Sequence, residues 1–261
     1  MGELQDRTAL VTGGTTGLGA AIVRAFLLEG ASVAFTGRDE RLGLAAEAAL
    51  SSLGRARFVR ADAADAAQVK GSVERAVAFL GGLDVLVNNA GVGVAATPLL
   101  TPLNDFDRVM AVNVRGAFCY AQACFPHLEA RRGCMIHIGS DAGELGEVDI
   151  GVYSVSKAAV HMLRKVLAVE AGRRGVRSNT IAPGDTEPGM RHIQAPGKDL
   201  RSDDDPARWP VPPVGRVGRA DDVAGAAVYL ASDSASFVNG IVLLVDGGAR
   251  AGFQASAGSP H

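Results

Sequence analysis

Three polar residues in the middle of the sequence have the types and spacing needed to transfer a proton. Tyr153 is followed four residues later by Lys157, and Ser140 precedes the tyrosine by thirteen residues. A separation of four places two side chains on one face of a helix. A free tyrosine has a pKa of about 10, which a neighbouring ammonium lowers. The set predicts an acid and base at Tyr153, with Lys157 lowering its pKa and Ser140 orienting the substrate oxygen. A tyrosine and a lysine alone would more often share a helix without any chemical role.

A glycine-rich turn near the N-terminus has the composition of a dinucleotide-binding site. The segment Thr12-Gly13-Gly14-Thr15-Thr16-Gly17-Leu18-Gly19 lies between a short apolar run and a helical pattern. Glycines allow the backbone to approach a pyrophosphate, whose charge the helix N-terminus attracts. The alternative is a tight turn without a ligand. The residues expected to contact the cofactor are Gly13, Thr15, Thr16, Gly17, Leu18 and Gly19.

The second apolar run ends where the choice between NAD and NADP is commonly made. Its end is Thr36-Gly37-Arg38. An acid here would bind the ribose of NAD, whereas an arginine would bind the 2′-phosphate of NADP. Arg38 is a planar cation suited to phosphate, so the sequence favours NADP(H). NAD(H) stays possible because Asp39 follows directly, and Arg38 could also be an ordinary surface charge.

These residues must be positioned by alternating strands and helices. Short apolar runs predict strands at Ala9–Thr12, Ser32–Thr36, Ala56–Arg60, Leu83–Asn88, Met135–Gly139, Arg177–Ile181 and Ile241–Val245. Helical spacing predicts helices at Gly17–Leu28, Arg41–Leu53, Ala66–Leu80, Asp105–Ala130, Tyr153–Ala171 and Asp221–Ala231. Strict alternation implies parallel strands joined by right-handed crossovers. The fold class is therefore α/β, a Rossmann-type doubly wound parallel sheet of about seven strands with helices on both faces.

No linker interrupts this alternation, so we expect one catalytic domain over residues 1–249. Within it, residues 187–213 are rich in Pro, Asp and Gly, and they form a candidate cover over the substrate. Residues 250–261 are expected to form a flexible tail.

Composition excludes several other classes of partner. The net charge is −2, and the 26 Lys and Arg residues are scattered, which argues against nucleic acid and anionic membrane. No apolar run is long enough for a membrane span, and no signal peptide is recognisable. The three cysteines, Cys119, Cys124 and Cys134, lack metal-ligand spacing and suit reduced thiols in the cytoplasm. No metal site is expected.

Further motifs occur in a fixed order along the chain. They are Asp62-Ala63 after the third expected strand, Asn88-Asn89-Ala90-Gly91 after the fourth, Asn113 in a helix, Pro183-Gly184 after the sixth strand, and Asp246-Gly247-Gly248 near the end. Together with the glycine turn and the Ser, Tyr and Lys set, they resemble the short-chain dehydrogenase/reductase family over nearly the whole chain.

The resemblance implies roles for these residues. Asp62 and Ala63 would border the adenine, and Asn113 would support a water-linked proton path to Lys157. Lys157 would also bind the nicotinamide ribose. The other residues implied to line the cofactor are Asn89, Ala90, Gly91, Tyr153, Pro183 and Gly184. Where many relatives have a Thr after the Pro-Gly pair, this chain has Pro188, and we expect Thr186 to bind the carboxamide instead.

The sequence is compatible with several classes of substrate. Ser140-Asp141-Ala142 and Thr186 resemble dihydrodiol dehydrogenases, but Glu147 stands where a carboxylate-binding arginine is expected, which disfavours an aromatic acid. Acidic residues at Glu144, Glu147, Asp149 and Glu187 suggest a polyol or an amine, although solvated rim charges are the simpler interpretation. The candidate substrate contacts are Ser140, Glu147, Tyr153, Glu187, His192 and Trp209.

The main hypothesis is an NADPH-dependent ketoreductase that interconverts a ketone and a secondary alcohol. One alternative is an NAD-dependent dehydrogenase of a cyclic diol, dihydrodiol or cyclitol. Another is a nucleotide-sensing protein without catalysis, which could dispense with Tyr153 and Lys157. The family resemblance implies a homotetramer or homodimer.

Overall fold

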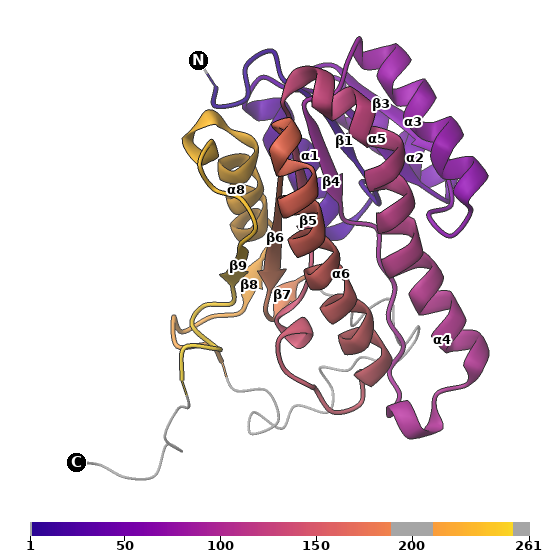
Figure 1. Cartoon of the computed structure of the whole chain (residues 1–261), viewed down its shortest axis with the longest axis vertical. Coiled ribbons are helices and arrows are strands. Elements are labelled where there is room, and N and C mark those ends of the chain that lie inside the picture. Colours follow the sequence, from indigo (N-terminus) through magenta and orange to yellow (C-terminus); the bar gives the residue numbers. More distant parts are fainter. Residues whose placement is uncertain (1, 189–210, 253–261) are drawn as a thin grey trace.

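Seven parallel strands form a central sheet in the order β3-β2-β1-β4-β5-β6-β9 (Figure 1). The structure is a computed structural model, and it describes residues 2–188 and 211–252. The strands are β1 (Thr8–Val11), β2 (Ser32–Gly37), β3 (Ala56–Arg60), β4 (Val85–Asn88), β5 (Cys134–Ile138), β6 (Arg177–Pro183) and β9 (Val242–Val245). Each pairs in parallel with its neighbours, which confirms the predicted doubly wound sheet.

The apolar strands alternate their side chains between the two faces of the sheet. Leu10, Leu86 and Met135 lie side by side in register and pack into the hydrophobic cluster of one face. The next residues along two of these strands, Val11 and Val87, pack into the cluster of the other face. All four residues of β4 are buried, because helices cover both faces.

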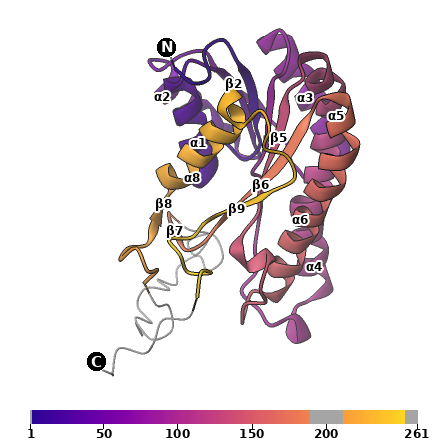
Figure 2. The ribbon, with the colours of Figure 1, turned by 60° about the vertical axis from the view of Figure 1, so that its left-hand side comes forward.

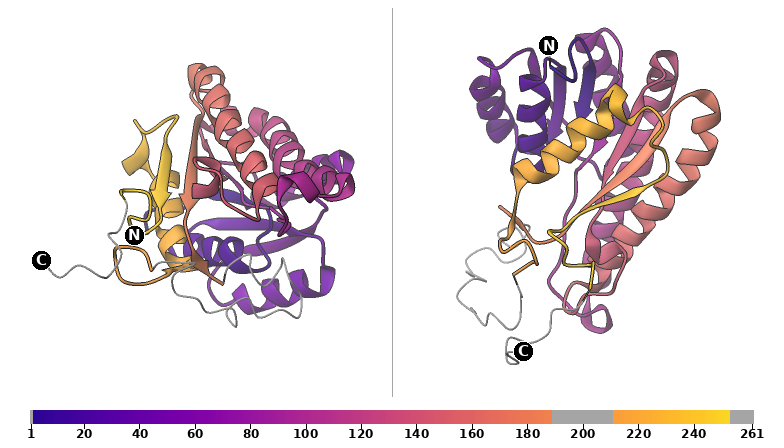
Figure 3. Two further views of the ribbon diagram at one scale, coloured as in Figure 1. Left: turned by 90° about the horizontal axis from the view of Figure 1, so that it is seen from below. Right: turned by 90° about the vertical axis from the view of Figure 1, so that its left-hand side faces the viewer.

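Helices form a layer on each side of the sheet (Figures 2 and 3). They are α1 (Gly17–Leu28), α2 (Glu40–Leu50), α3 (Ala66–Leu80), α4 (Leu103–Met110), α5 (Ala117–Arg131), α6 (Gly151–Glu170) and α8 (Ala220–Ala231). The helices α1, α2 and α8 cover one face, where Phe26 and Leu230 share a cluster. The helices α3, α5 and α6 cover the other, where Val73 packs with Leu128.

The long helix predicted over Asp105–Ala130 is divided in the structure. The helix α4 ends at Met110, a π-helical segment follows at Ala111–Gly116, and α5 begins at Ala117. The prediction of a continuous α-helix is therefore wrong at these six positions. A π turn accommodates one additional residue, and such turns occur frequently at functional sites.

Two short strands that the sequence did not predict stand beside the expected cover segment. β7 (Thr186–Glu187) pairs in parallel with β8 (Gly218–Arg219). Of the expected cover, residues 189–210 lie outside the described residues, as do residues 253–261 of the expected tail.

Candidate active site

The predicted site residues gather at the carboxyl ends of the strands. The order of the sheet changes direction at β1, which pairs with β2 on one side and with β4 on the other. In open parallel sheets a ligand crevice forms outside the strands at such a point. The glycine turn follows β1 at this edge, and the turns after β4, β5 and β6 meet it there.

The glycine turn depends on glycine at particular positions, either for its backbone conformation or for lack of space. Gly13 and Gly17 have φ angles of +64° and +56°, which other residues adopt at a cost. A Cβ on Gly19 would lie 2.2 Å from the carbonyl oxygen of Gly13 and 2.5 Å from Nδ2 of Asn89. The N-cap residue of α1, Thr16, makes no side-chain capping bond. The free amide groups at the start of α1 therefore fit a pyrophosphate.

Asn89 fastens the turn after β4 to the glycine turn. Its Nδ2 donates to the carbonyl oxygens of Thr12 at 2.9 Å and of Gly13 at 3.0 Å. In return, the amides of Asn89 and Ala90 each donate to Oγ1 of Thr12 at 2.9 Å. Asn89 thus fixes the shape of the phosphate turn from its neighbouring strand.

The carboxylate of Asp39 is engaged at the start of α2. It caps this helix by accepting a hydrogen bond from the amide of Leu42 at 2.9 Å. Arg38, one residue earlier, is exposed, and within the described parts of the chain it forms no hydrogen bond or ion pair. At the end of β3, Asp62 accepts from the amide of Ala64 at 2.9 Å, so its carboxylate shapes the turn containing Ala63.

Ser140, Tyr153 and Lys157 come together as buried residues. Ser140 caps a short 3₁₀ turn (Asp141–Gly143) after β5, and its hydroxyl donates to Oδ1 of Asp141 at 3.2 Å. Tyr153 and Lys157 share the first turns of α6, with Nζ 5.4 Å from the centre of the tyrosine ring. Nζ donates to the carbonyl of Ile138 at 2.7 Å.

Burial has opposite effects on the two ionisable groups. It is the main cause that raises the pKa of Tyr153, while hydrogen bonding with Ser140 lowers this pKa and the charges of Asp141 and Glu147 raise it. Burial also lowers the pKa of Lys157, to about 8. A neutral phenol that can donate a proton is therefore the resting form at neutral pH.

Asn113 lies in the π-helical segment and is fully hydrogen-bonded. Its Oδ1 accepts from the amide of Val92 at 2.8 Å, and its Nδ2 donates to the Val92 carbonyl at 2.8 Å and to Oγ of Ser156 at 2.9 Å. Ser156 in turn donates to the carbonyl of Tyr153 at 2.7 Å. A Cβ on Gly91 would lie 3.6 Å from both Asn113 Oδ1 and Lys157 Nζ, so the three residues adjoin.

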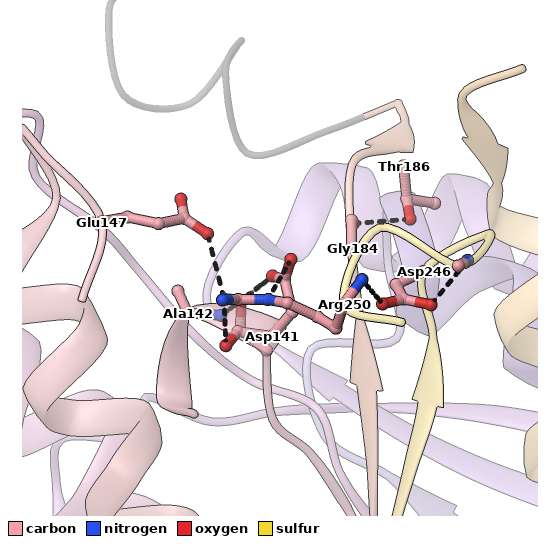
Figure 4. A network of polar contacts seen from close by, with 9 residues as sticks. Asp141, Ala142, Glu147, Gly184, Thr186, Asp246 and Arg250 are labelled. Atoms are coloured by element: carbon pink, nitrogen blue, oxygen red, sulfur yellow. Dashed lines mark hydrogen bonds and ion pairs between the residues drawn. The ribbon is translucent and has the colours of Figure 1, made fainter. Parts of the chain in front are cut away.

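The turn after β6 packs closely on β9, and it carries one hydroxyl that can accept a hydrogen bond from a ligand. Pro183 ends β6, and the amide of Gly184 donates to the carbonyl of Val245 at 3.1 Å. Thr186 donates its hydroxyl proton to the carbonyl of Gly184 at 2.9 Å (Figure 4). The lone pairs of that hydroxyl are thereby left for a donor such as a carboxamide amino group.

The acidic residues near the substrate mouth are partly engaged with a histidine and an arginine of the protein. Glu144 lies 2.8 Å from Nδ1 of the buried His161, and Glu147 lies 3.8 Å from Nη2 of Arg250. Both contacts favour the interpretation of these acids as structural charges over that of an amine-binding site. Glu187 is exposed at the end of β7.

Three residues of this region were not among the predicted site residues: Asp141, Ser156 and Arg250. Asp141 was noted only as part of the Ser140-Asp141-Ala142 motif, and Ser156 adjoins Lys157, which was the available signal for it. Arg250 bonds to a residue 109 positions away, which no local pattern shows.

Some of the predicted site residues fall outside the part of the chain that the structure describes. The candidate substrate contacts His192 and Trp209 are outside the described residues. Within residues 2–188 and 211–252 there is no cluster of His, Cys, Asp and Glu that could hold a metal ion. No helix in the same ranges is both long and apolar enough to cross a membrane.

Known proteins match the chain over nearly its whole length. A family model described as enoyl-(acyl carrier protein) reductase matches residues 13–250. L-fucose dehydrogenase of Mus musculus is 37% identical over 253 residues, covering 96% of this chain and 91% of that protein. D-threitol dehydrogenase of Mycolicibacterium smegmatis is 38% identical over 253 residues, covering 94% of each. A blue fluorescent protein from a metagenomic library, solved in complex with NADPH, has a TM-score of 0.85 and 35% identity, covering 95% of this chain and 99% of that one.

Proposed function

The chain belongs to the short-chain dehydrogenase/reductase family and is an oxidoreductase of alcohols and ketones, and on this premise we propose that Tyr153 transfers the proton of its reaction. The observation that carries the proposal is the buried phenol of Tyr153, with Ser140 close enough to hydrogen-bond it and Lys157 beside its ring. A nicotinamide cofactor, when bound, supplies or accepts the hydride.

In ketone reduction, Tyr153 donates its proton to the substrate oxygen as that oxygen gains negative charge. Ser140 donates a second hydrogen bond and orients the oxygen. In alcohol oxidation the same groups act in reverse, so the phenolate must form first. Lys157 supplies positive charge near the phenol and binds the ribose hydroxyls. With a pKa of about 8, it is still largely charged at neutral pH.

Asn113 supports this chemistry by position. Its bonds to Val92 and Ser156 hold the loop after β4 against α6, so that Gly91 stays next to Lys157. The proton path implied by the family resemblance would begin there, on the side of Lys157 away from Tyr153.

NADP(H) is the proposed cofactor. Arg38 is an exposed guanidinium after β2, while the carboxylate of Asp39 is directed to the start of α2 and not to a ribose. The solved relative in complex with NADPH supports the same choice. The alternative, an NAD-dependent dehydrogenase of a cyclic diol, dihydrodiol or cyclitol, requires Asp39 to leave its capping position.

The proposed substrate is a small neutral alcohol or ketone, with polyhydroxylated compounds foremost. Two similar proteins are named for L-fucose and D-threitol, both of which carry several hydroxyl groups. Glu147 and Glu187 are the proposed contacts to such hydroxyls, since carboxylates accept hydrogen bonds from them.

We also propose a homotetramer or homodimer in the cytoplasm. Apolar side chains are exposed on the outer surface of α5 and α6, among them Phe118 and Met162, which are 50% and 58% exposed. Exposed apolar patches commonly meet a second subunit, and these side chains are the proposed contacts. The three cysteines are free thiols, as a reducing compartment would keep them.

The direct test is Tyr153→Phe. Loss of the hydroxyl should leave NADPH binding intact, measured by cofactor fluorescence, and lower turnover of a ketone panel by roughly three orders of magnitude or more. Retained turnover would remove Tyr153 from the mechanism. Absence of turnover in the unaltered protein, despite tight NADPH binding, would instead favour the nucleotide-sensing alternative.

A further inference from the structure

Arg250 joins the end of the described chain to the turn that carries Ser140 (Figure 4). Its Nη2 donates to the main-chain carbonyl of Asp141 at 2.6 Å, and its Nε lies 3.5 Å from the Asp141 carboxylate. The same Nη2 lies 3.8 Å from the carboxylate of Glu147. The side chain of Arg250 is only 15% exposed, so solvent screens these charges weakly.

The backbone around Arg250 is fixed by Asp246, directly after β9. Asp246 accepts hydrogen bonds from the amides of Gly248 at 2.9 Å and Arg250 at 2.8 Å. A Cβ on Gly184 would lie 2.9 Å from the Cβ of Asp246, so this turn packs directly on the end of β6. The guanidinium is therefore presented to the serine turn from a rigid neighbouring strand, although Arg250 is the first residue of the tail expected from the sequence.

Asp141 and Glu147 place negative charge next to Tyr153, and both make its phenolate harder to form. Burial raises the pKa of Asp141, and the charge of Arg250 is the largest influence that lowers it again. Arg250 thus lowers the pKa of Asp141 and balances its charge.

The charged groups around the phenol come from four parts of the chain. Lys157 lies on the same helix, Asp141 and Glu147 follow β5, and Arg250 follows β9. Asp185, in the turn after β6, acts on Asp141 and raises its pKa. Arg250 is a cation that forms ion pairs with both Asp141 and Glu147.

We propose that Arg250 is a positioning residue of the reaction, which holds the carboxylates of Asp141 and Glu147 and balances their charge beside Tyr153. The inference rests on the proposed function, since it assumes that Tyr153 carries the proton. The three charges sum to −1 with Arg250 present and would sum to −2 without it.

The test is the pH dependence of kcat/KM for alcohol oxidation, which requires the phenolate. Arg250→Met keeps an unbranched apolar stem in place of the arginine and removes its charge. We expect the midpoint of the rising limb to move up by roughly 0.5 to 1.5 pH units, the effect of one unit charge at short range in a partly screened site. Arg250→Lys should keep the midpoint of the unaltered protein.

A double variant separates charge from packing. Arg250→Met combined with Glu147→Gln restores the total of −1, so the midpoint should return most of the way to its original value even if the absolute rate stays low. Arg174→Met is the matched control, because Arg174 pairs with Glu129 just before the amino end of β6, whereas the serine turn lies at the carboxyl ends of the strands. It should leave the midpoint unchanged.

Two results would overturn the inference. One is a midpoint in Arg250→Met within about 0.2 pH units of the original. The other is a shifted midpoint that the added Glu147→Gln does not move back, which would indicate a change of packing alone. Failure of the proposed function is separately visible, because Tyr153→Phe would then retain the turnover of the unaltered protein.

Discussion

Replacing Gly19 with alanine would disturb the phosphate turn at a defined point. The added Cβ would lie 2.2 Å from the carbonyl oxygen of Gly13, about 1 Å closer than such atoms approach, and 2.5 Å from Nδ2 of Asn89. Relief requires the turn to move and the two Asn89 bonds to lengthen. Overpacking of this kind costs about 1–3 kcal/mol and each weakened hydrogen bond about 1 kcal/mol. Together these costs give an expected loss of about 3–5 kcal/mol in the free energy of unfolding.

Two measurements test this expectation. The Tm should fall by roughly 6–20 °C, at about 2–4 °C for each kcal/mol in a chain of this size. The Kd for NADPH should rise at least about tenfold, because the displaced turn no longer directs its amides at the phosphate. Gly225→Ala is the matched control, since Gly225 is also helical and a Cβ there would meet no atom within 4 Å. It should be neutral or stabilise by about 0.5–1 kcal/mol.

A Gly19→Ala protein with unchanged Tm and unchanged Kd for NADPH would refute both the close packing of this turn and its contact with the phosphate. A fall in Tm with unaltered Kd would show that the turn is tightly packed but does not bind the phosphate.

Three further substitutions have defined outcomes. Lys157→Met should abolish turnover and raise the Tm at pH 7. The pKa of Lys157 in the folded protein, about 8, lies below its unfolded value near 10.5, so burial of the charged amine lowers stability at pH 7. This penalty disappears as the pH rises between the two values, so the gain in Tm should be absent near pH 10.5. Arg38→Asp should reverse the ratio of kcat/KM for NADPH and NADH, and an unchanged ratio would exclude contact with the 2′-phosphate. Asp39→Ala should lower the free energy of unfolding by about 1 kcal/mol through loss of the cap while leaving the NADPH preference in place; a shift toward NADPH would mean that Asp39 binds a ribose.

The sequence was sufficient for those features that depend on local pattern. The strands were recognisable because both faces of the sheet are covered, so that three successive residues of β4, Val85-Leu86-Val87, are apolar. The positions of Gly13 and Gly19 were recognisable because a turn that approaches phosphate tolerates only backbone there. The pairing of Tyr153 with Lys157 followed from helical spacing.

Features that depend on the direction of a single polar group were not predictable. The carboxylate of Asp39 caps α2 because it accepts a hydrogen bond from the amide of Leu42. The residue types at these two positions are equally compatible with a carboxylate that binds a ribose. Arg250 reaches the serine turn because β9 pairs with β6 at the edge of the sheet, a contact between distant residues that composition does not reveal.

The π-helical segment at Ala111–Gly116 has a consequence for how the surrounding helices evolve. One additional residue in a turn rotates everything beyond it by about a quarter of a revolution, so α4 and α5 present their apolar sides in different phases. Sequence changes in α4 can therefore alter its outer surface without disturbing the side of α5 that faces the sheet. Removing one residue from this segment would bring the two helices into phase and turn Asn113 away from Val92.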